Sequence, residues 1–238
     1  RLSATYDIGP GLVLSGSVYK QIASNVDRDG AGSSSTLPHV RSDGSLYTEF
    51  GDPALERLTF AWYARPTANV YSRVTVGYLE RMHAGVSGEV LWKPVDSQLA
   101  LGVEVNYTQQ RDTDGGLGFD EYDYDVVTGH VSAYYDFGNG FLGQFDVGRY
   151  LAGDLGATIS VDRVFANGWK VGAFATVTDV SASDFGEAGF DKGVRFTIPF
   201  NWMLGTETRK GFGMTLRPGS GDGGARLDVD GRLYESIR

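Results

Sequence analysis

Val103-Glu104-Val105-Asn106-Tyr107-Thr108 alternates an apolar with a polar residue along its whole length. This period of two is typical of a β-strand with one apolar and one polar face. The run from Val194 to Trp202 repeats the pattern, as does the run from Val171 to Val177, where Phe174 falls on the polar side. The pattern predicts about twelve strands, near residues 2–8, 12–22, 57–65, 70–80, 85–93, 98–109, 125–137, 141–150, 156–165, 169–179, 193–202 and 210–217.

The connections between these segments alternate in length. Tight-turn sequences such as Gly9-Pro10-Gly11 and Gly138-Asn139-Gly140 follow the odd-numbered segments. Longer connections follow even-numbered segments, at 23–56, 110–124 and 180–192 among others. In an antiparallel meander, odd and even connections lie at opposite ends. We therefore expect an all-β fold, an antiparallel up-and-down transmembrane β-barrel of about 12 strands with short turns at one end and long loops at the other.

Length and composition agree with a single domain over residues 1–238. Glycine accounts for 34 of the 238 residues, about twice its usual share. No run of about 18 uncharged apolar residues occurs, which excludes a transmembrane helix. The absence of cysteine excludes disulfides and thiolate metal sites. The net charge of −9 argues against binding to nucleic acid, because the phosphate backbone attracts clustered Lys and Arg.

The polar face of the expected strands predicts a water-filled interior. A soluble β-sandwich alternates too, but its polar face meets water and usually carries many lysines and glutamates. This chain has five lysines, and its polar positions hold small Ser, Thr and Gly residues with isolated charges. The residues expected to line a lumen are Arg73, Glu89, Glu104, His130, Asp146, Asp162, Arg195 and Arg217.

Aromatic residues on the apolar face lie towards segment ends, as Trp62, Trp92 and Trp202 illustrate. Amphipathic rings prefer the headgroup level of a membrane, so this distribution predicts an aromatic girdle. The alternative is that the rings form the core of a soluble β-sandwich adhesin.

No motif identifies a catalytic centre, and we expect no enzymatic activity, catalytic residue, metal or cofactor. The histidines form no HExxH-type pair, and no serine has a nucleophile-elbow context. Three Asp-x-Asp-Gly sequences lack the later glutamate of a calcium loop. Glu89 and Glu104 could in principle form a glycosidase pair, so an enzyme acting on polysaccharide or lipid in the lumen is an alternative.

An acidic loop follows the sixth segment and contains Asp112, Asp114, Asp120, Glu121 and Asp123. A solvated surface loop is the simplest interpretation. Two functional interpretations are that divalent cations link these carboxylates to lipid phosphates, and that the loop steers a charged polymer.

Several ordered blocks point to a known family. They include Leu37-Pro38-His39-Val40-Arg41-Ser42-Asp43, Gly85-Val86-Ser87-Gly88-Glu89-Val90-Leu91-Trp92, Phe190-Asp191-Lys192-Gly193-Val194-Arg195, Asp222-Gly223-Gly224-Ala225-Arg226-Leu227 and Gly231-Arg232-Leu233-Tyr234-Glu235. From about Leu37 to its end, the chain resembles the YjbH family of exopolysaccharide-biosynthesis proteins. The resemblance implies the carboxy-terminal barrel region of an outer-membrane lipoprotein encoded with partners that make or export a polysaccharide. Residues 218–238 are too polar for a lipid-facing strand, and we expect them to enter the lumen or to dock in the periplasm.

Together these observations predict a non-enzymatic barrel in the cell outer membrane that takes part in export or assembly of an extracellular polysaccharide. The expected partners are outer-membrane lipid, the secreted polysaccharide and other proteins of an exopolysaccharide operon. Tyr134 joins the lumen residues named above as a candidate for polysaccharide contact, because an aromatic face can stack on a sugar ring. The sequence leaves open whether the lumen is open or plugged.

Overall fold

The computed structural model describes residues 1–21, 35–181, 190–199, 211–217 and 221–237. Within them lie twelve strands and the short helices α1 (Gly44–Glu49) and α4 (Leu233–Ile237). The strands are β1 (Leu2–Gly9), β2 (Leu12–Tyr19), β3 (Ala54–Thr67), β4 (Val70–Tyr78), β5 (His83–Trp92), β6 (Leu99–Gln110), β7 (Asp125–Gly138), β8 (Phe141–Arg149), β9 (Leu155–Val164), β10 (Lys170–Thr178), β11 (Asp191–Pro199) and β12 (Gly211–Leu216). Neither of these helices has the length and apolar character needed to cross a membrane.

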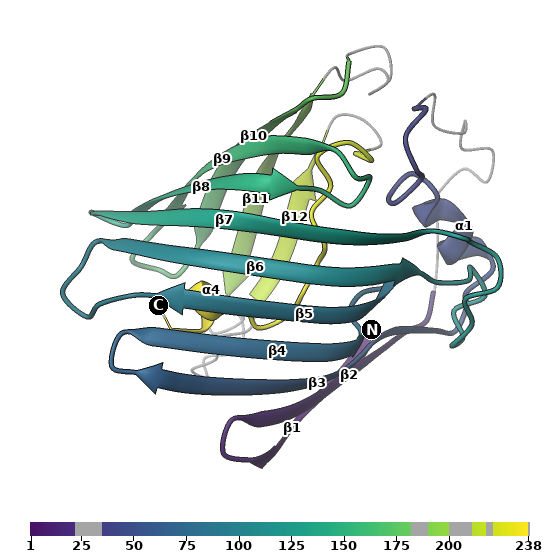
Figure 1. Ribbon diagram of the computed structural model, residues 1–238, viewed down its shortest axis with the longest axis horizontal. Helices are drawn as coiled ribbons and strands as arrows, with labels where there is room; N and C mark the ends of the chain where they lie inside the picture. Colours follow the sequence, from purple (N-terminus) through teal and green to yellow (C-terminus); the bar gives the residue numbers. More distant parts are fainter. Residues whose placement is uncertain (22–34, 182–189, 200–210, 218–220, 238) are drawn as a thin grey trace.

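All twelve strands belong to one antiparallel sheet, in the order β1 to β12. The structure thus confirms the predicted up-and-down, all-β fold. Tight hairpins gather at one end, and the long connections after β2 and β6 lie at the other (Figure 1). Helix α1 lies within the first long connection, where the strand pattern predicted no element. Residues 200–202 of the strand expected at 193–202 and most of the connection at 180–192 lie outside the described residues.

The sheet is apolar outside and polar inside. On β6, Leu101, Val103 and Val105 are exposed, whereas Glu104 and Asn106 are buried. The strand period of two carries this division along the chain, because successive side chains point to opposite faces. A β-sandwich would instead bury its valines and leucines between two packed sheets. The observed sheet is therefore not a sandwich.

The sheet curves around residues 221–237, which we call the tail. The tail follows β12 in the chain and lies within the concave side of the sheet (Figure 1). It is contacted from β3, where Tyr63 bonds Gly231, and from β8, where Asp146 bonds Arg226. We call the concave space the lumen. Within the described residues, β1 and β12 are the two edges of the sheet.

Two small apolar clusters fix the tail in place. One joins Ala225, Leu227 and Val229 of the tail to Leu79, Leu151 and other residues near the long-loop end. The other joins Leu233 and Tyr234 to Leu91, Ala100, Tyr134 and Leu142 on the strands. The tail therefore supplies much of the apolar packing that an ordinary domain obtains from a continuous core.

Candidate functional site: the lumen and the tail

A row of charged side chains crosses the lumen wall. Arg73, Glu89, Glu104 and His130 are paired in register on β4, β5, β6 and β7, and all four are buried. Carboxylates that lie directly opposite each other in a sheet repel. Arg73 offsets this repulsion, because its Nη2 lies 3.0 Å from Glu89 Oε2 and 3.4 Å from Glu104 Oε2.

Two arginines of the tail complete the neutralisation of this row. Arg232 donates from Nε to Glu104 Oε2 (2.8 Å) and from Nη2 to Glu104 Oε1 (3.1 Å). Arg226 donates from Nη1 to Asp146 Oδ1 (3.0 Å), and its Nη2 lies 3.6 Å from Glu104 Oε1. Glu104 thus faces three guanidinium groups. A buried carboxylate needs such partners, because an isolated buried charge is strongly destabilising.

The tail backbone is also held by carboxylates. Three buried acidic side chains accept hydrogen bonds from its N–H groups: Gly224 N to Asp154 Oδ2 (2.8 Å), Asp228 N to Glu80 Oε2 (2.8 Å) and Leu233 N to Glu89 Oε1 and Oε2 (3.2 and 3.1 Å). Charge-assisted hydrogen bonds of this kind are stronger than neutral ones. They fix the path of an otherwise irregular segment.

Aromatic contacts set the position of the end of the tail. The rings of Tyr134 and Tyr234 stack with centroids 4.0 Å apart and an interplanar angle of 6°. Tyr63 donates its hydroxyl to the carbonyl oxygen of Gly231 at 3.2 Å. Gly231 has φ +71°, and a Cβ there would overlap the Tyr63 hydroxyl. Only glycine fits this close approach.

Glu80 lies in the connection from β4 to β5 and bonds residues of three other parts of the chain: the connection before β3, the start of β5 and the tail. Arg41 donates from Nη1 to Oε1 (2.6 Å) and from Nη2 to Oε2 (2.9 Å), and His83 Nδ1 lies 2.7 Å from Oε1. Asp228 of the tail donates its N–H to the same carboxylate. Burial by itself would raise the pKa of the Glu80 carboxyl, but Arg41 and His83 hold that pKa well below its usual range.

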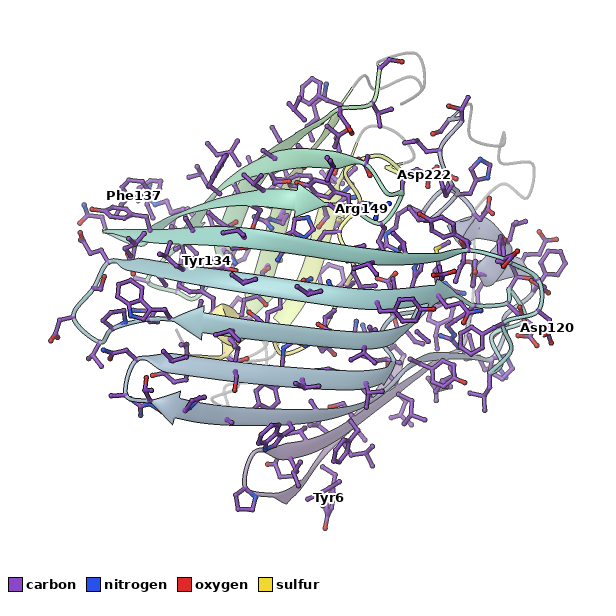
Figure 2. The ribbon with its side chains drawn as sticks, viewed as in Figure 1. Tyr6, Asp120, Tyr134, Phe137, Arg149 and Asp222 are labelled. Carbon is purple, nitrogen blue, oxygen red and sulfur yellow. The ribbon has the colours of Figure 1, made fainter. Side chains whose placement is uncertain are left out.

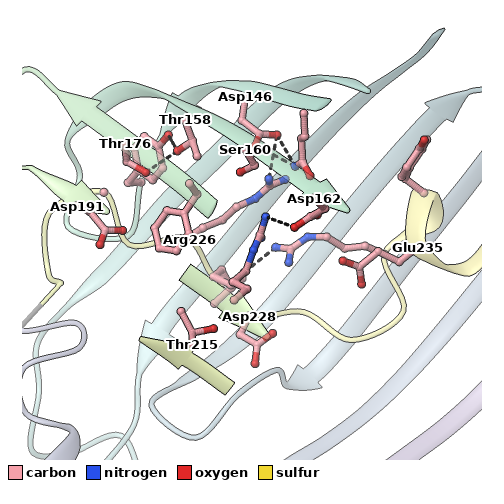
Figure 3. Close-up of a pocket in the computed structure, with 18 of the residues that line it drawn as sticks. Asp146, Thr158, Ser160, Asp162, Thr176, Asp191, Thr215, Arg226, Asp228 and Glu235 are labelled. Carbon is pink, nitrogen blue, oxygen red and sulfur yellow. Dashed lines mark hydrogen bonds and ion pairs between the residues drawn. The ribbon is translucent and has the colours of Figure 1, made fainter. Parts of the chain in front are cut away.

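The predicted lumen residues fall into two groups. Arg73, Glu89, Glu104 and His130 lie in the row already described. A second group surrounds a cavity of about 500 Å³ between the tail and strands β8 to β12, shown in Figure 3. The predicted residues that line it are Tyr134, Asp146, Asp162, Arg195 and Arg217.

The acidic loop is tied together by its own hydrogen bonds. Asp112 Oδ1 accepts from Glu121 N (2.7 Å), and Asp114 Oδ1 accepts from Gly116 N (2.7 Å). Glu121 Oε2 accepts from both the N–H and the hydroxyl of Thr113, each at 2.8 Å.

Asp120 and Asp123 of the same loop are exposed; Figure 2 labels Asp120 at the long-loop end. Across the ranges that the structure describes, no three His, Cys, Asp or Glu side chains gather as metal ligands. The observed bonds order the loop, and neither proposed use of its carboxylates is tested by them.

Comparison with known proteins identifies the family. The model of the family described as "Exopolysaccharide biosynthesis protein YbjH" matches residues 1–238. The chain belongs to the YjbH family. A lipoprotein of Escherichia coli (strain K12), "Uncharacterized lipoprotein YjbH", is 34% identical over 230 residues, which are 94% of this chain and 33% of that protein.

These matches confirm the resemblance seen in the sequence blocks. The chain spans about a third of the length of its curated YjbH relative. No solved structure matches the chain.

Several residues of the lumen escaped the sequence analysis. Glu80, Arg226 and Arg232 carry the charge pairing of this YjbH chain. Glu80 ends the segment expected at 70–80, in phase with the apolar Val74 and Val76, and the two arginines lie beyond the last expected strand. Arg226 and Arg232 stand in the polar tail, whose excess of polar groups was visible, but their partners are 80 and 128 residues away. Asp191, the first residue of β11, was missed as a lumen residue for a similar reason, because it stands at a segment boundary.

Replacing Arg232 by Gln is expected to loosen the tail. The change removes a bidentate bond to buried Glu104, and a hydrogen bond to a charged group contributes about 1.5–3 kcal/mol. Because about 1.4 kcal/mol corresponds to a factor of ten, amide hydrogen exchange in residues 221–237 should accelerate at least about tenfold. Arg163→Gln is the control, since Arg163 lies over the outward rings of Phe141 and Phe165. An unchanged rate of amide hydrogen exchange in R232Q would contradict the conclusion that the bonds from Arg232 to Glu104 hold the tail in place.

Replacing Glu80 by Gln is expected to lower stability at neutral pH, and this loss should shrink on acidification. The pKa of Glu80 is depressed in the folded protein, so its ionised form favours folding above the unfolded value of about 4.3. Below that pH the unfolded chain binds a proton first, and the advantage declines towards the folded pKa.

Urea unfolding of the wild type and E80Q in detergent measures this difference at pH 7, 5 and 3. We expect roughly 1–3 kcal/mol at pH 7 and 5 and less at pH 3. Asp120→Asn, in the exposed part of the acidic loop, provides the comparison. A difference that keeps its full size at pH 3 would show that the ion pairs of Glu80 are not its source.

Proposed function

We propose that this chain is a non-enzymatic β-barrel of the cell outer membrane that takes part in export or assembly of an extracellular polysaccharide. The proposal rests on the distribution of side chains over the sheet, whose outer face is apolar and whose inner face is polar. An outward apolar surface of this extent is costly in water and favourable against hydrocarbon. The polysaccharide part of the proposal is based on the family description, which names exopolysaccharide biosynthesis.

The aromatic residues support a membrane location for the outer face. Trp92, Tyr135 and Phe137 are exposed at the hairpin end of β5 and β7, and Tyr78 and Tyr107 lie nearer the long-loop end. Amphipathic rings favour the interface between hydrocarbon and headgroups. Outer-membrane lipid is therefore the first partner that we propose for this surface. The lipoprotein name of the relative agrees with attachment to a membrane.

The lumen offers a polar environment for a sugar chain. The tail fills the part next to β3 to β7, and the cavity along β8 to β12 is lined by hydroxyl, amide and charged groups. Such groups replace the hydrogen bonds that a hydrated sugar loses. The secreted polymer and other proteins of the exopolysaccharide operon are the remaining partners in this proposal.

The positions of Glu89 and Glu104 support a role without catalysis. Glu89 is bonded to Arg73 and to the Leu233 N–H, and Glu104 faces three arginines. Neither carboxylate lines the cavity between the tail and β8 to β12. A glycosidase needs its two carboxylic groups on either side of a bound sugar.

An arginine placed on the outer face tests the membrane location. Val131, in the middle of β7, is 60% exposed. In a bilayer, Val131→Arg should lower stability by about 2–4 kcal/mol, as a cation does at the midplane. Val95→Arg is the matched control, because Val95 is 77% exposed in the connection between β5 and β6.

The measurement is urea unfolding of each variant folded into lipid vesicles. A change within about 0.5 kcal/mol for Val131→Arg, as at a water-facing position, would contradict the lipid-facing assignment.

Export in cells tests the proposed role. Loss of the protein should reduce extracellular polysaccharide, and the wild-type gene should restore it. Glu89→Gln preserves the shape of the side chain but removes its charge, so we expect polymer of unchanged length distribution as long as the protein is folded. The polymer in the medium is quantified and sized by chromatography, with Asp120→Asn as control. Loss of polymer processing in folded E89Q would favour the enzyme instead.

A further inference from the structure

The cavity between the tail and β8 to β12 has an uneven arrangement of charge. The side chains of Lys170, Arg195 and Arg217 are 31%, 37% and 37% exposed. Their carboxylate partners Asp162 and Asp191 are only 5% and 3% exposed. On this wall the acids therefore lie behind the bases, and the three cations are its more accessible charges.

The buried acids hold these cations in position without using all their donors. Asp162 Oδ2 lies 3.2 Å from Lys170 Nζ, and Asp162 Oδ1 accepts from Arg195 Nη2 at 3.2 Å. Arg217 Nη1 lies 3.6 Å from Asp191 Oδ2. A guanidinium carries five N–H donors, and the bond from Arg195 to Asp162 engages Nη2 alone. Donors thus remain for a ligand.

The carboxylates on the remaining sides of the cavity have cationic partners of their own. Asp146 accepts from Arg226 at 3.0 Å, and Asp228 accepts from Arg57 at 3.1 Å. Glu235 lies close enough to stabilise the charge of Arg232. Asp228 and Glu235 are nevertheless exposed on the tail side of the cavity, whereas Lys170 and Arg195 lie on the neighbouring strands β10 and β11 and Arg217 directly follows β12.

An aromatic ring forms part of the same wall. Phe174 breaks the alternation of β10 by standing on its polar face. The Cζ atoms of Arg195 and Arg217 lie 5.6 and 5.0 Å from the centroid of its ring. Gly193, its register partner on β11, leaves the space, because a Cβ there would lie 2.7 Å from Phe174 Cε1. Cation–π contacts of this kind hold guanidinium groups against a ring.

A chain of hydroxyl groups runs along the adjacent wall. Tyr150 and Thr158 oxygens are 2.6 Å apart, and those of Thr158 and Thr176 are 2.7 Å apart. Figure 3 shows Thr158, Ser160 and Thr176 on the strand side, facing Arg226 and Asp228 of the tail. Each hydroxyl can both donate and accept, which suits the hydroxyls of a sugar. The volume of about 500 Å³ lies within the range of ligand pockets.

We infer that this cavity binds an anionic sugar residue, with Lys170, Arg195 and Arg217 on its negative group and the Thr158–Thr176 wall on its hydroxyls. The inference rests on the proposed polysaccharide function and adds the charge class of the polymer. Arginine suits this task, because its planar fork matches a carboxylate.

Isothermal titration of the purified protein in detergent tests the inference with tetragalacturonate, cellotetraose and inorganic phosphate as probes. We expect tetragalacturonate to bind, with an affinity that falls as salt rises, and cellotetraose to bind at least about tenfold more weakly. R195Q combined with R217Q should weaken tetragalacturonate binding at least about tenfold. Gly193→Ala should also weaken it without removing charge, because the added Cβ would press on the Phe174 ring and on the Leu216 carbonyl oxygen beside Arg217. Arg163→Gln, on the outer face of β9, should bind as the wild type does, and circular dichroism confirms that each variant is folded.

Each contrary result overturns the inference. Equal binding of the acidic and neutral tetrasaccharides would leave a sugar site without charge selection. Binding of phosphate as tight as that of tetragalacturonate would reduce the site to simple anion binding. If no probe binds while cells still need the protein for export, the cavity assignment fails and the proposed function stands. Failure of the export experiment itself would remove the proposed function separately.

Discussion

Pairing of buried charge inside the curved sheet is the constraint on which the rest of the structure depends. Glu104 is almost fully buried and faces Arg73 from its own wall and Arg226 and Arg232 from the tail. Without the tail, one guanidinium would remain for the opposed carboxylates of Glu89 and Glu104. Leaving buried charges uncompensated is among the most destabilising changes in a protein. The same ion pairs that neutralise the wall therefore also hold the tail in the lumen.

The tail takes over the role that a hydrophobic core has in most domains. Most valines and leucines of the strands are directed outward, and inward ones such as Leu91 and Leu142 pack against the tail. Leu227, Leu233 and Tyr234 of the tail provide the apolar contacts inside, close to the paired charges. The interior is thereby divided into a filled side next to β3 to β7 and a polar cavity next to β8 to β12. This division lets one wall serve stability while the other is available to a ligand.

The strand pattern could be predicted from the sequence because it is local. The alternation in β6 places Glu104 and Asn106 on one face whatever the rest of the chain does, and the glycine-rich hairpins fix the order of the strands. Phe174 was visible as an exception to the pattern, but its role was not, because Arg195 and Arg217 come from β11 and from the residue after β12. The hydrogen bonds to carboxylates of the acidic loop join residues of the loop to one another. The sequence alone does not distinguish an acidic side chain that is bonded within its own loop from one that is solvated. Glu80 ended the segment expected at 70–80, in phase with the apolar Val74 and Val76, whereas in the structure β4 ends at Tyr78 and Glu80 lies in the connection that follows.

The sequence by itself determined the all-β meander, the separation of an apolar from a polar face and membership of the YjbH family, since each depends on short-range pattern or on ordered blocks of residues. Only the tertiary structure decided that the tail lies in the lumen and which carboxylates it neutralises. The physical reason is that a tail rich in charge is compatible with solvent as well as with a charged interior. Its position is set by the energy of contacts with Glu80, Glu89, Glu104 and Asp146, which become neighbours only when the sheet curves.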